Sequence, residues 1–352
     1  MIVAFVVLAI VLLLIIEFTL SKKLVVNIFY KSNLDKGIAE PGEPITLISE
    51  VSNYNKIFVP FLRLREYIPA EATLLDDKMR VFSGTFWDVL EKTLSIKRKE
   101  RLTKFESFSV DKRGRYSFGD YEVSVGDIFG LQESRVSGAV PHEFVVIPRR
   151  AEDRHLKDVV EGFIGDISVR RFIMEDPVLT IGFNEYTGRE PMKDISWTRT
   201  ASRGQLMVKN YDHTTDINVT VMLNLDILNE ADFEESLSVT RMVIESLESK
   251  KIPYAFRTNG VLYTRTGHLE YAPKGLGDAH VKEILYALAT ANTGRIYSFN
   301  TLVNRVLREK KDKSNYFLIT GALSGNDEVA LQRLQRSTDG EVAVITVDGV
   351  KS

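Results

Sequence analysis

The stretch INVTVMLNLDILNEADFEESLSVTRMVIESL, residues 217–247, predicts a buried strand followed by a helix. Residues 219–225 are β-branched or apolar at nearly every position, which is typical of a strand covered on both faces. Residues 233–247 repeat apolar side chains at helical spacing, namely Phe233, Leu237, Met242, Val243 and Leu247. A strand followed by a helix is the unit from which parallel sheets are built.

The same alternation continues toward the end of the chain. Further strands are expected over residues 253–257, 316–319 and 342–347, and further helices over residues 279–291 and 328–336. This order indicates crossover units and a mostly parallel, doubly wound α/β domain over residues 217–352. Because ligands bind at the carboxyl ends of strands in such sheets, the expected binding loops follow Leu225 and lie around residues 258–260 and 321–325.

Residues 24–150 have a different pattern, in which short extended segments alternate with turn residues such as Pro41-Gly42 and Gly126-Asp127. Repeated short strands with this punctuation predict a β-sandwich-like domain. The basic stretch at residues 97–104 is interpreted as a solvated hairpin end, in preference to a contact with phosphates or lipid headgroups.

An apolar run at residues 2–20 predicts a transmembrane anchor over residues 1–20. About 19 residues at a rise of about 1.5 Å each nearly match the ~30 Å core of a bilayer. A cleaved signal peptide and a buried core helix are the alternatives, but a signal peptide normally has a basic start and a small-residue cleavage site, and neither is present. Lysines follow the run and none precedes it, so we expect a single-pass protein of the cell membrane with its soluble body in the cytoplasm.

Composition narrows the function classes. A net charge of -2 gives no reason to expect nucleic acid as a partner, and the absence of cysteine excludes thiolate chemistry. The five histidines are scattered, and the chain has no phosphate-binding loop of the G-x-x-x-x-G-K-[ST] type. We therefore expect no cofactor, no nucleotide hydrolysis and no catalytic residues.

The joining segment, residues 151–216, contains the most distinctive motif, EYTGREPMKDISWTRTASRGQLMVK at residues 185–209. It resembles the central motif of the family called domain of unknown function 58 (DUF58), which has E-Y, a glycine, R-x-I-D-W-K, a small residue, A-R and L-x-V-K/R. Earlier pieces are also similar to that family, at residues 41–44, 112–119, 126–131 and 146–149. The likeness runs from about residue 40 to Lys209.

The resemblance implies that a von Willebrand factor A-like domain follows the motif. The expected fold class is thus α+β multidomain, with a transmembrane helix, a β-sandwich-like domain and a von Willebrand A-like doubly wound α/β domain. Three features depart from the family: Ser196 replaces an Asp, Thr198 replaces a Lys, and one membrane helix replaces two. No role of that Asp or Lys can be carried over.

Von Willebrand A domains often hold Mg²⁺ through D-x-S-x-S after the first strand, because hard cations prefer oxygen ligands. Here Asn224, Asp226 and Leu228 stand at those positions, and Gly321 stands where a later Asp would lie. We interpret the polar residues that follow as a loop and a helix N-cap, namely Asp226, Asn229, Glu230 and Asp232. We expect no metal site.

The motif is the expected protein-binding site, with Glu185, Tyr186, Lys193, Asp194, Trp197, Arg203 and Lys209 as its residues. Glu185 and Asp194 are interpreted as salt-bridge partners of Arg189, Lys193 or Arg203 rather than as an acid–base pair. Trp197 is expected to pack as a hydrophobic pin, and an exposed interface anchor is the alternative.

These features predict a membrane-anchored, non-catalytic scaffold or adaptor. The resemblance implies a partner of the MoxR-type AAA+ ATPase class, in a chaperone-like or envelope-related assembly. Two alternatives remain open: an enzyme that acts on envelope polymers through the motif carboxylates, and an extracytoplasmic adhesion module.

Overall fold

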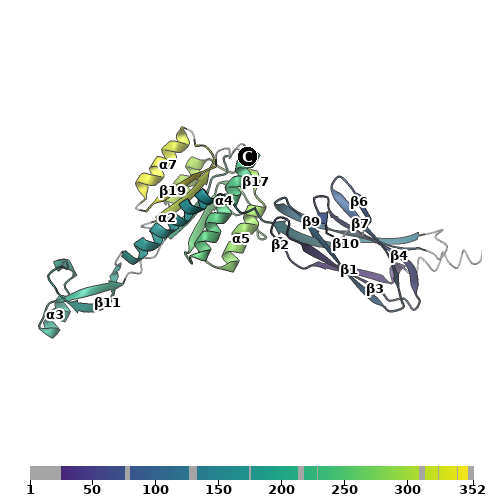
Figure 1. Ribbon diagram of the computed structural model, residues 1–352, viewed down its shortest axis with the longest axis horizontal. Coiled ribbons are helices and arrows are strands. Elements are labelled where there is room, and N and C mark those ends of the chain that lie inside the picture. Colours follow the sequence, from purple (N-terminus) through teal and green to yellow (C-terminus); the bar gives the residue numbers. More distant parts are fainter. Residues whose placement is uncertain are drawn as a thin grey trace, which may run out of the picture. The chain divides into compact units, whose positions relative to one another are not determined.

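The computed structural model describes residues 25–75, 80–126, 133–173, 176–212, 218–227, 229–308, 314–323, 325–338 and 340–347 (Figure 1). The chain divides into two compact units. The first unit is formed by residues up to Arg149 together with Leu288–Thr290, and the second by the rest of the chain from Arg150 onward.

The first unit contains two β-sheets. The four-stranded sheet has the order β1 (Ile28–Leu34), β3 (Ile45–Asn53), β8 (Arg101–Ser109) and β5 (Thr73–Leu74). The six-stranded sheet has the order β2 (Ile38–Ala39), β10 (Glu133–Val146), β9 (Gly114–Gly126), β4 (Val59–Pro69), β7 (Trp87–Ile96) and β6 (Arg80–Ser83). The described pairings are antiparallel except that of β2 with β10.

Alternating side chains build the core between these sheets. Along β3, buried and half-buried residues alternate over most of the strand, as the two-residue period of a pleated strand requires. Ile45 of β3 and Phe108 of β8 pack in one cluster with Leu90 of β7 and Phe144 of β10, so the core draws on both sheets. Burial of these large apolar side chains is the main stabilising term for the unit.

The second unit is organised around a five-stranded sheet, called here the central sheet. Its order is β16 (Tyr271–Gly275), β14 (Tyr254–Thr258), β13 (Asn218–Leu223), β18 (Ser314–Thr320) and β19 (Val342–Thr346). The pairs among β14, β13, β18 and β19 are parallel, whereas β16 is antiparallel to β14. A separate two-stranded sheet pairs β15 (Gly260–Val261) with β17 (Asn292–Arg295).

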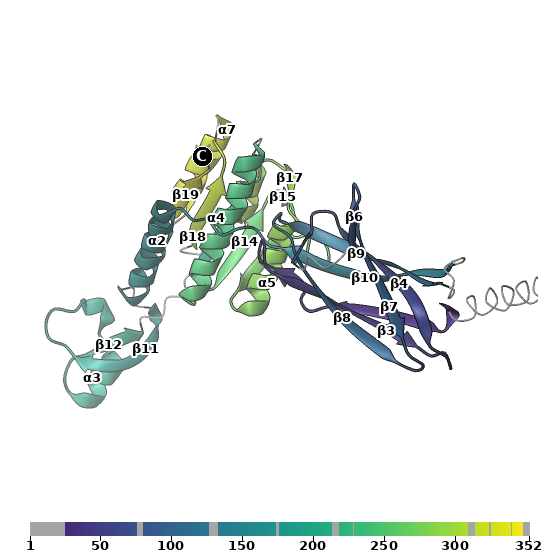
Figure 2. The ribbon, with the colours of Figure 1, turned by 45° about the vertical axis from the view of Figure 1, so that its right-hand side comes forward.

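Helices cover both faces of the central sheet. The helices outside the joining motif are α2 (Arg154–Ile173), α4 (Glu230–Ser249), α5 (Asp278–Ala289), α6 (Phe299–Arg308) and α7 (Asn326–Ser337). Helix α4 contacts β13 and β18 and also lies against α2 (Figure 2). Helices α6 and α7 pack on the other face, where Leu302 and Leu334 share a cluster with Met222 and Leu318.

The joining motif folds as a small module of its own, residues 176–212, called here the hairpin module. Strands β11 (Asp176–Glu185) and β12 (Met207–Asp212) form its antiparallel pair. A 3₁₀ turn, η1 (Met192–Asp194), and a short helix, α3 (Trp197–Arg203), lie between them in sequence.

The expected fold class is wrong. Among the described residues, strands account for 44% and helices for 28%, several sheets are present, and no clear von Willebrand A-like doubly wound α/β fold is formed. The antiparallel strand β16 and the separate β15–β17 pair depart from a scheme in which helical crossovers join parallel strands. Sequence periodicity missed these strands because they have only two to five residues, too few to display a period of two.

The predicted transmembrane anchor at residues 1–20 lies outside the described residues. In the described part of the chain, no helix combines the length and apolar character that a membrane span requires.

Candidate functional site

The hairpin module holds the expected protein-binding residues on an ordered backbone. Glu185 pairs with Met207 across the two strands, and a further bridge joins Ile195 to Val208. The Ser196 amide donates to the Met207 carbonyl over 2.8 Å, and the Met207 amide donates to Thr200 Oγ1 over 3.0 Å. Ile195, Met207 and Val208 are buried, so the module has a small core.

Trp197 is the most conspicuous side chain of the module. It is the first residue of α3, directly after the buried Ser196, and 64% of its surface is exposed. The expected packing of Trp197 as a hydrophobic pin is therefore wrong, and the alternative of an exposed side chain is what the structure has. Met192, in the preceding 3₁₀ turn, is 68% exposed.

The end of α3 is also defined. Gly204 has a φ of +73°, and its amide donates to the Thr200 carbonyl over 2.9 Å. A residue in this left-handed conformation is how many helices end, and glycine adopts it without steric cost. The short helix that carries Trp197 is thus fixed at its carboxyl end by the sequence.

Two carboxylates of the module, those of Glu185 and Glu190, accept hydrogen bonds from other residues of the module. Glu185 accepts a hydrogen bond from Gln205 Nε2 over 2.6 Å, in place of the salt bridge expected from the sequence. Glu190 accepts hydrogen bonds from the Thr187 hydroxyl and amide, and these bonds hold the pKa of its carboxyl below the ordinary value. The Glu190 contacts fix backbone geometry, the Glu185 contact joins two side chains, and neither creates an acid–base pair.

The remaining predicted residues are distributed over the module. Lys193 and Arg203 are exposed, and Tyr186, Asp194 and Lys209 are half-buried. The Tyr186 amide donates to the Leu206 carbonyl over 2.9 Å. Sequence reasoning missed Arg199, whose guanidinium lies 5.1 Å from the centre of the Phe183 ring. No regular spacing links that pair in the sequence, because the two residues come from different elements.

The carboxyl edge of the central sheet, where ligands were expected, is closed by a buried amide network. Asn259 Nδ2 donates to Asn224 Oδ1 over 2.7 Å, and Asn224 Nδ2 donates to Thr320 Oγ1 over 2.9 Å. All three side chains are at most 1% exposed. Asp226 contacts Arg295. No group of three or more His, Cys, Asp or Glu side chains in the described residues is arranged to hold a metal ion.

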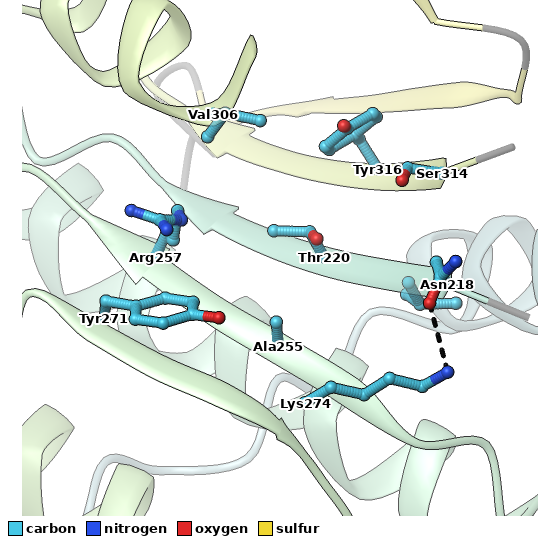
Figure 3. Close-up of a pocket in the computed structure, with 10 residues that line it drawn as sticks. Asn218, Thr220, Ala255, Arg257, Tyr271, Lys274, Val306, Ser314 and Tyr316 are labelled. Carbon is cyan, nitrogen blue, oxygen red and sulfur yellow. Dashed lines mark hydrogen bonds between the residues drawn. The ribbon is translucent and has the colours of Figure 1, made fainter. Parts of the chain in front are cut away.

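A cavity of about 170 Å³ lies instead on the α6 side of the central sheet (Figure 3). Parallel register places Asn218 and Thr220 of β13 beside Ser314 and Tyr316 of β18, and all four line the cavity. Asn218 and Ser314 are the first residues of their strands. The cavity therefore extends from the amino-terminal ends of β13 and β18 to Arg257, which lies opposite Met222.

The two charged residues that line this cavity are both cations, Arg257 of β14 and Lys274 of β16. Arg257 is 7% exposed, and its guanidinium lies 3.9 Å from the centre of the Tyr271 ring. Lys274 Nζ donates to Asn218 Oδ1 over 3.1 Å. Burial raises the pKa of Tyr316, so its hydroxyl is protonated at neutral pH.

Comparison with known proteins assigns this chain to no family. No family model matches the chain, and no curated protein matches it. The resemblance to DUF58 stays a prediction from the motif at residues 185–209.

Solved structures show only weak likeness. A Pseudomonas fluorescens alkylpurine DNA glycosylase bound to DNA is 11% identical with a TM-score of 0.21, and the match covers 34% of this chain and 30% of the glycosylase. The CARDB domain of a Pyrococcus furiosus protein is 15% identical with a TM-score of 0.21, over 34% of this chain and 90% of that domain. A type II cohesin domain of Acetivibrio cellulolyticus is 14% identical with a TM-score of 0.24, and the match covers 34% of this chain and 95% of that domain. Scores this low carry no argument about fold or function.

Proposed function

We propose that this chain is a membrane-anchored, non-catalytic adaptor that binds a protein partner through the hairpin module. The observation that carries the proposal is the 64% exposure of Trp197 on an ordered module. A large aromatic side chain left in water offers apolar area that a partner can bury, and Trp and Arg are the residue types that most often dominate binding energy.

The ordered backbone of the module also favours binding through Trp197. Backbone hydrogen bonds from Ser196 and Met207 and the fixed end of α3 at Gly204 hold Trp197 at a defined place. Binding through a pre-ordered segment avoids the conformational entropy cost of ordering a loop. The basic side chains of Lys193 and Arg203 are exposed in the same module and suit an acidic partner surface.

The class of partner rests on the sequence motif. Its resemblance to DUF58 points to a MoxR-type AAA+ ATPase, and the chain has no nucleotide-binding loop of its own, so energy would come from the partner. Anchoring by residues 2–20, with lysines after that run, would place the adaptor at the cytoplasmic side of the membrane.

The experiment compares capture of a MoxR-type ATPase by the full-length chain in membranes and by two variants. Trp197→Ala should lose capture, whereas Trp87→Ala should retain it. Trp87 is the other tryptophan of the chain, it is 43% exposed, and it belongs to the first unit, so it is a matched control. Equal capture by wild type and Trp197→Ala would overturn the docking surface.

Orientation is tested separately. A reporter that is active only outside the cytoplasm, fused after Ser352, should be inactive. An active reporter would contradict the cytoplasmic adaptor and favour the adhesion alternative.

A further inference from the structure

One end of the first unit, called here the amphipathic end, combines exposed apolar side chains with exposed cations. The apolar side chains come from the beginning of the described chain and from the loop between β3 and β4, and they are Val26, Phe29, Tyr54, Ile57 and Phe58. The cations come from the same loop and from the turn between β7 and β8, called here the basic turn, and they are Lys56, Lys97, Arg98 and Lys99.

Buried amide side chains hold these three segments together. Asn53, which is 1% exposed, donates from Nδ2 to the Lys97 carbonyl over 2.9 Å and to the Ile57 carbonyl over 3.1 Å. Asn53 Oδ1 accepts from the Asn55 amide over 2.9 Å, and Asn55 Oδ1 accepts from Asn27 Nδ2 over 3.1 Å. The apolar side chains and the basic turn are therefore presented together, on a backbone fixed by hydrogen bonds.

The apolar side chains form a patch rather than isolated exposed positions. The Phe29 and Tyr54 rings meet edge to face with their centres 5.1 Å apart, yet they remain 57% and 60% exposed. Phe58, in the same loop as Tyr54, is 51% exposed. Single exposed apolar residues are ordinary, whereas a group of them on neighbouring segments marks an interaction surface.

The chain enters the first unit at this same end. The described part begins at Val25, and Figure 2 shows its purple start at one end of the sheets of this unit. Residues 2–20 are the predicted membrane span, so only residues 21–24 separate that span from Val25. At about 3.6 Å per residue at most, this connection reaches about 14 Å. Such an anchor would hold the amphipathic end close to the headgroup layer, which adds about 5–8 Å to each side of the hydrocarbon core.

The charge of the basic turn favours anionic lipids. Its three cations are exposed, whereas the carboxylate of the next residue, Glu100, accepts a hydrogen bond from the Lys97 amide within the turn. Arg101 is used within the unit, where its Nε lies 3.1 Å from Glu50 Oε1. Basic side chains near the cytoplasmic leaflet are attracted by its anionic headgroups, and tyrosine is enriched at headgroup level.

We propose that the amphipathic end docks on an anionic lipid bilayer, with its apolar side chains among the headgroups and its cations on the lipid phosphates. The sequence alone favours a solvated end for the basic turn, and the exposed rings held beside it are what favour lipid contact. This inference rests on the membrane anchoring in the proposed function, but it requires no partner of the hairpin module.

The test measures contact with lipid directly. The full-length chain carrying Phe58→Trp in a Trp87→Phe, Trp197→Phe background has a single tryptophan, placed in the patch. It is reconstituted into vesicles of phosphatidylcholine and phosphatidylglycerol, with or without bromine on the acyl chains. Bromolipids should quench the fluorescence of this tryptophan at least twofold. Absence of quenching would overturn the proposal, and Tyr54→Trp in the same background is a second probe of the patch.

Phe86→Trp in the same background is the matched control. Phe86 is 77% exposed and directly precedes β7, whereas the basic turn follows the other end of that strand. Its fluorescence should not be quenched. A blue-shifted but unquenched Phe58→Trp would show that protein covers the patch, either residues 1–24 or a second copy of the chain, and would also overturn the proposal.

Charge variants assign the contact to the basic turn. Quenching of the Phe58→Trp probe should fall at least twofold when its three cations are removed by Lys97→Gln, Arg98→Gln and Lys99→Gln. The matched control makes the same change in net charge at exposed cations of the second unit, by Lys250→Gln, Lys251→Gln and Lys282→Gln. An equal effect of the two triple variants would contradict a specific role of the basic turn.

Flotation with vesicles of phosphatidylcholine alone separates this inference from the anchor. A chain that floats with these vesicles but shows no quenching in the anionic ones keeps the proposed anchor and overturns the docking surface. A chain that does not float with neutral vesicles, yet is quenched in anionic ones, supports the docking surface and contradicts the anchor.

Discussion

Lys92 Nζ lies 2.6 Å from Glu66 Oε2 in the interior of the first unit, and the same ammonium group lies 2.8 Å from Glu106 Oε1. The three side chains are 2–9% exposed. Lys92 and Glu66 come from strands β7 and β4 of the six-stranded sheet, and Glu106 comes from β8 of the other sheet. This ionic cluster therefore joins the two sheets.

Glu66 has further partners in the same region. The Tyr30 hydroxyl donates to Glu66 Oε1 over 2.7 Å, and the Ser49 hydroxyl donates to the same oxygen. Burial and the neighbouring Glu66 charge raise the pKa of Tyr30 far above its ordinary value, so Tyr30 remains a donor at any physiological pH. Each buried carboxylate oxygen of Glu66 is thereby bonded, which limits the cost of burying charge.

Replacement of the central cation should destabilise the first unit strongly. In Lys92→Met, two buried carboxylates lose their counter-charge, and loss of one partner from a buried pair typically costs about 3–5 kcal/mol of unfolding free energy. Urea unfolding can be followed by Trp87 fluorescence in a Trp197→Phe background, so that the signal comes from the first unit alone.

The matched control removes the charges together. Lys92→Met combined with Glu66→Gln and Glu106→Gln should regain most of the lost stability, since no uncompensated charge remains. A loss below about 1 kcal/mol in Lys92→Met would contradict a dry ionic cluster and indicate water access.

His142 should make the first unit less stable in mild acid. It is 8% exposed, and a hydrogen bond of 2.7 Å joins its Nε2 to Ser32 Oγ. Burial lowers the pKa of His142, and the Glu66 charge acts in the opposite direction with smaller effect. The unfolded chain therefore binds a proton at higher pH than the folded chain, and stability present above the ordinary His pKa of about 6.5 is lost as pH falls below it.

The measurement is the urea midpoint of the Trp87 signal at pH 7.5 and at pH 5.5, again in the Trp197→Phe background. The protein with His142 should lose stability between the two, and His142→Gln should lose less. An equal loss in both proteins would assign the pH dependence to other groups.

Gly119 should not tolerate a side chain. Its φ is +140°, and an added Cβ would lie 2.0 Å from the Val140 carbonyl oxygen. The register between β9 and β10 shifts here, since Ala139 pairs with Asp120 and His142 with Phe118. Gly119 thus faces two residues of a β-bulge, where the backbones approach closely.

Gly119→Ala should cost about 2 kcal/mol or more, because both strain and steric overlap arise. Gly114→Ala is the control on the same strand, since its added Cβ would meet the Tyr116 ring at an ordinary 3.5 Å. Similar midpoints for the two variants would show that the bulge relaxes.

Apolar periodicity in the sequence predicted those elements in which the apolar spacing is long and regular. The helix expected over residues 233–247 lies within α4, and Phe233 and Leu237 are buried there. The strand expected over residues 219–225 overlaps β13. In contrast, the direction of β16 depends on its pairing with β14, which no apolar period within five residues encodes.

The candidate sites were foreseen only in part. The motif at residues 185–209 was found because its residues are contiguous, but the exposure of Trp197 depends on how the module folds. The cavity was not predicted, because Arg257 and Lys274 are brought together only by strand pairing, and nothing in the sequence distinguishes them from other charged residues. Lys92, Glu66 and Glu106 were missed for the same reason: their separation along the chain hides a cluster made by tertiary pairing.

Asn224 should be a stabilising residue of the central sheet rather than a ligand. Its amide joins Asn259 and Thr320, and Asn259 Oδ1 also accepts from the Leu225 amide over 2.8 Å. Removing the Asn224 side chain leaves the buried Nδ2 of Asn259 and hydroxyl of Thr320 without these partners. Each orphaned polar group costs about 1–3 kcal/mol, so Asn224→Ala should lower the free energy of opening of β13 by at least about 2 kcal/mol.

Native-state hydrogen exchange of the β13 and β18 amides measures this loss directly. Thr320→Val is the comparison, because it removes one bond, keeps the shape and leaves the Asn224–Asn259 bond in place, so it should cost less than Asn224→Ala. If the β13 and β18 amides of Asn224→Ala instead exchange as slowly as those of the wild type, water must enter the carboxyl edge and replace the lost Asn224 side chain. That edge would then be open enough to admit a ligand, contrary to the closed network described above.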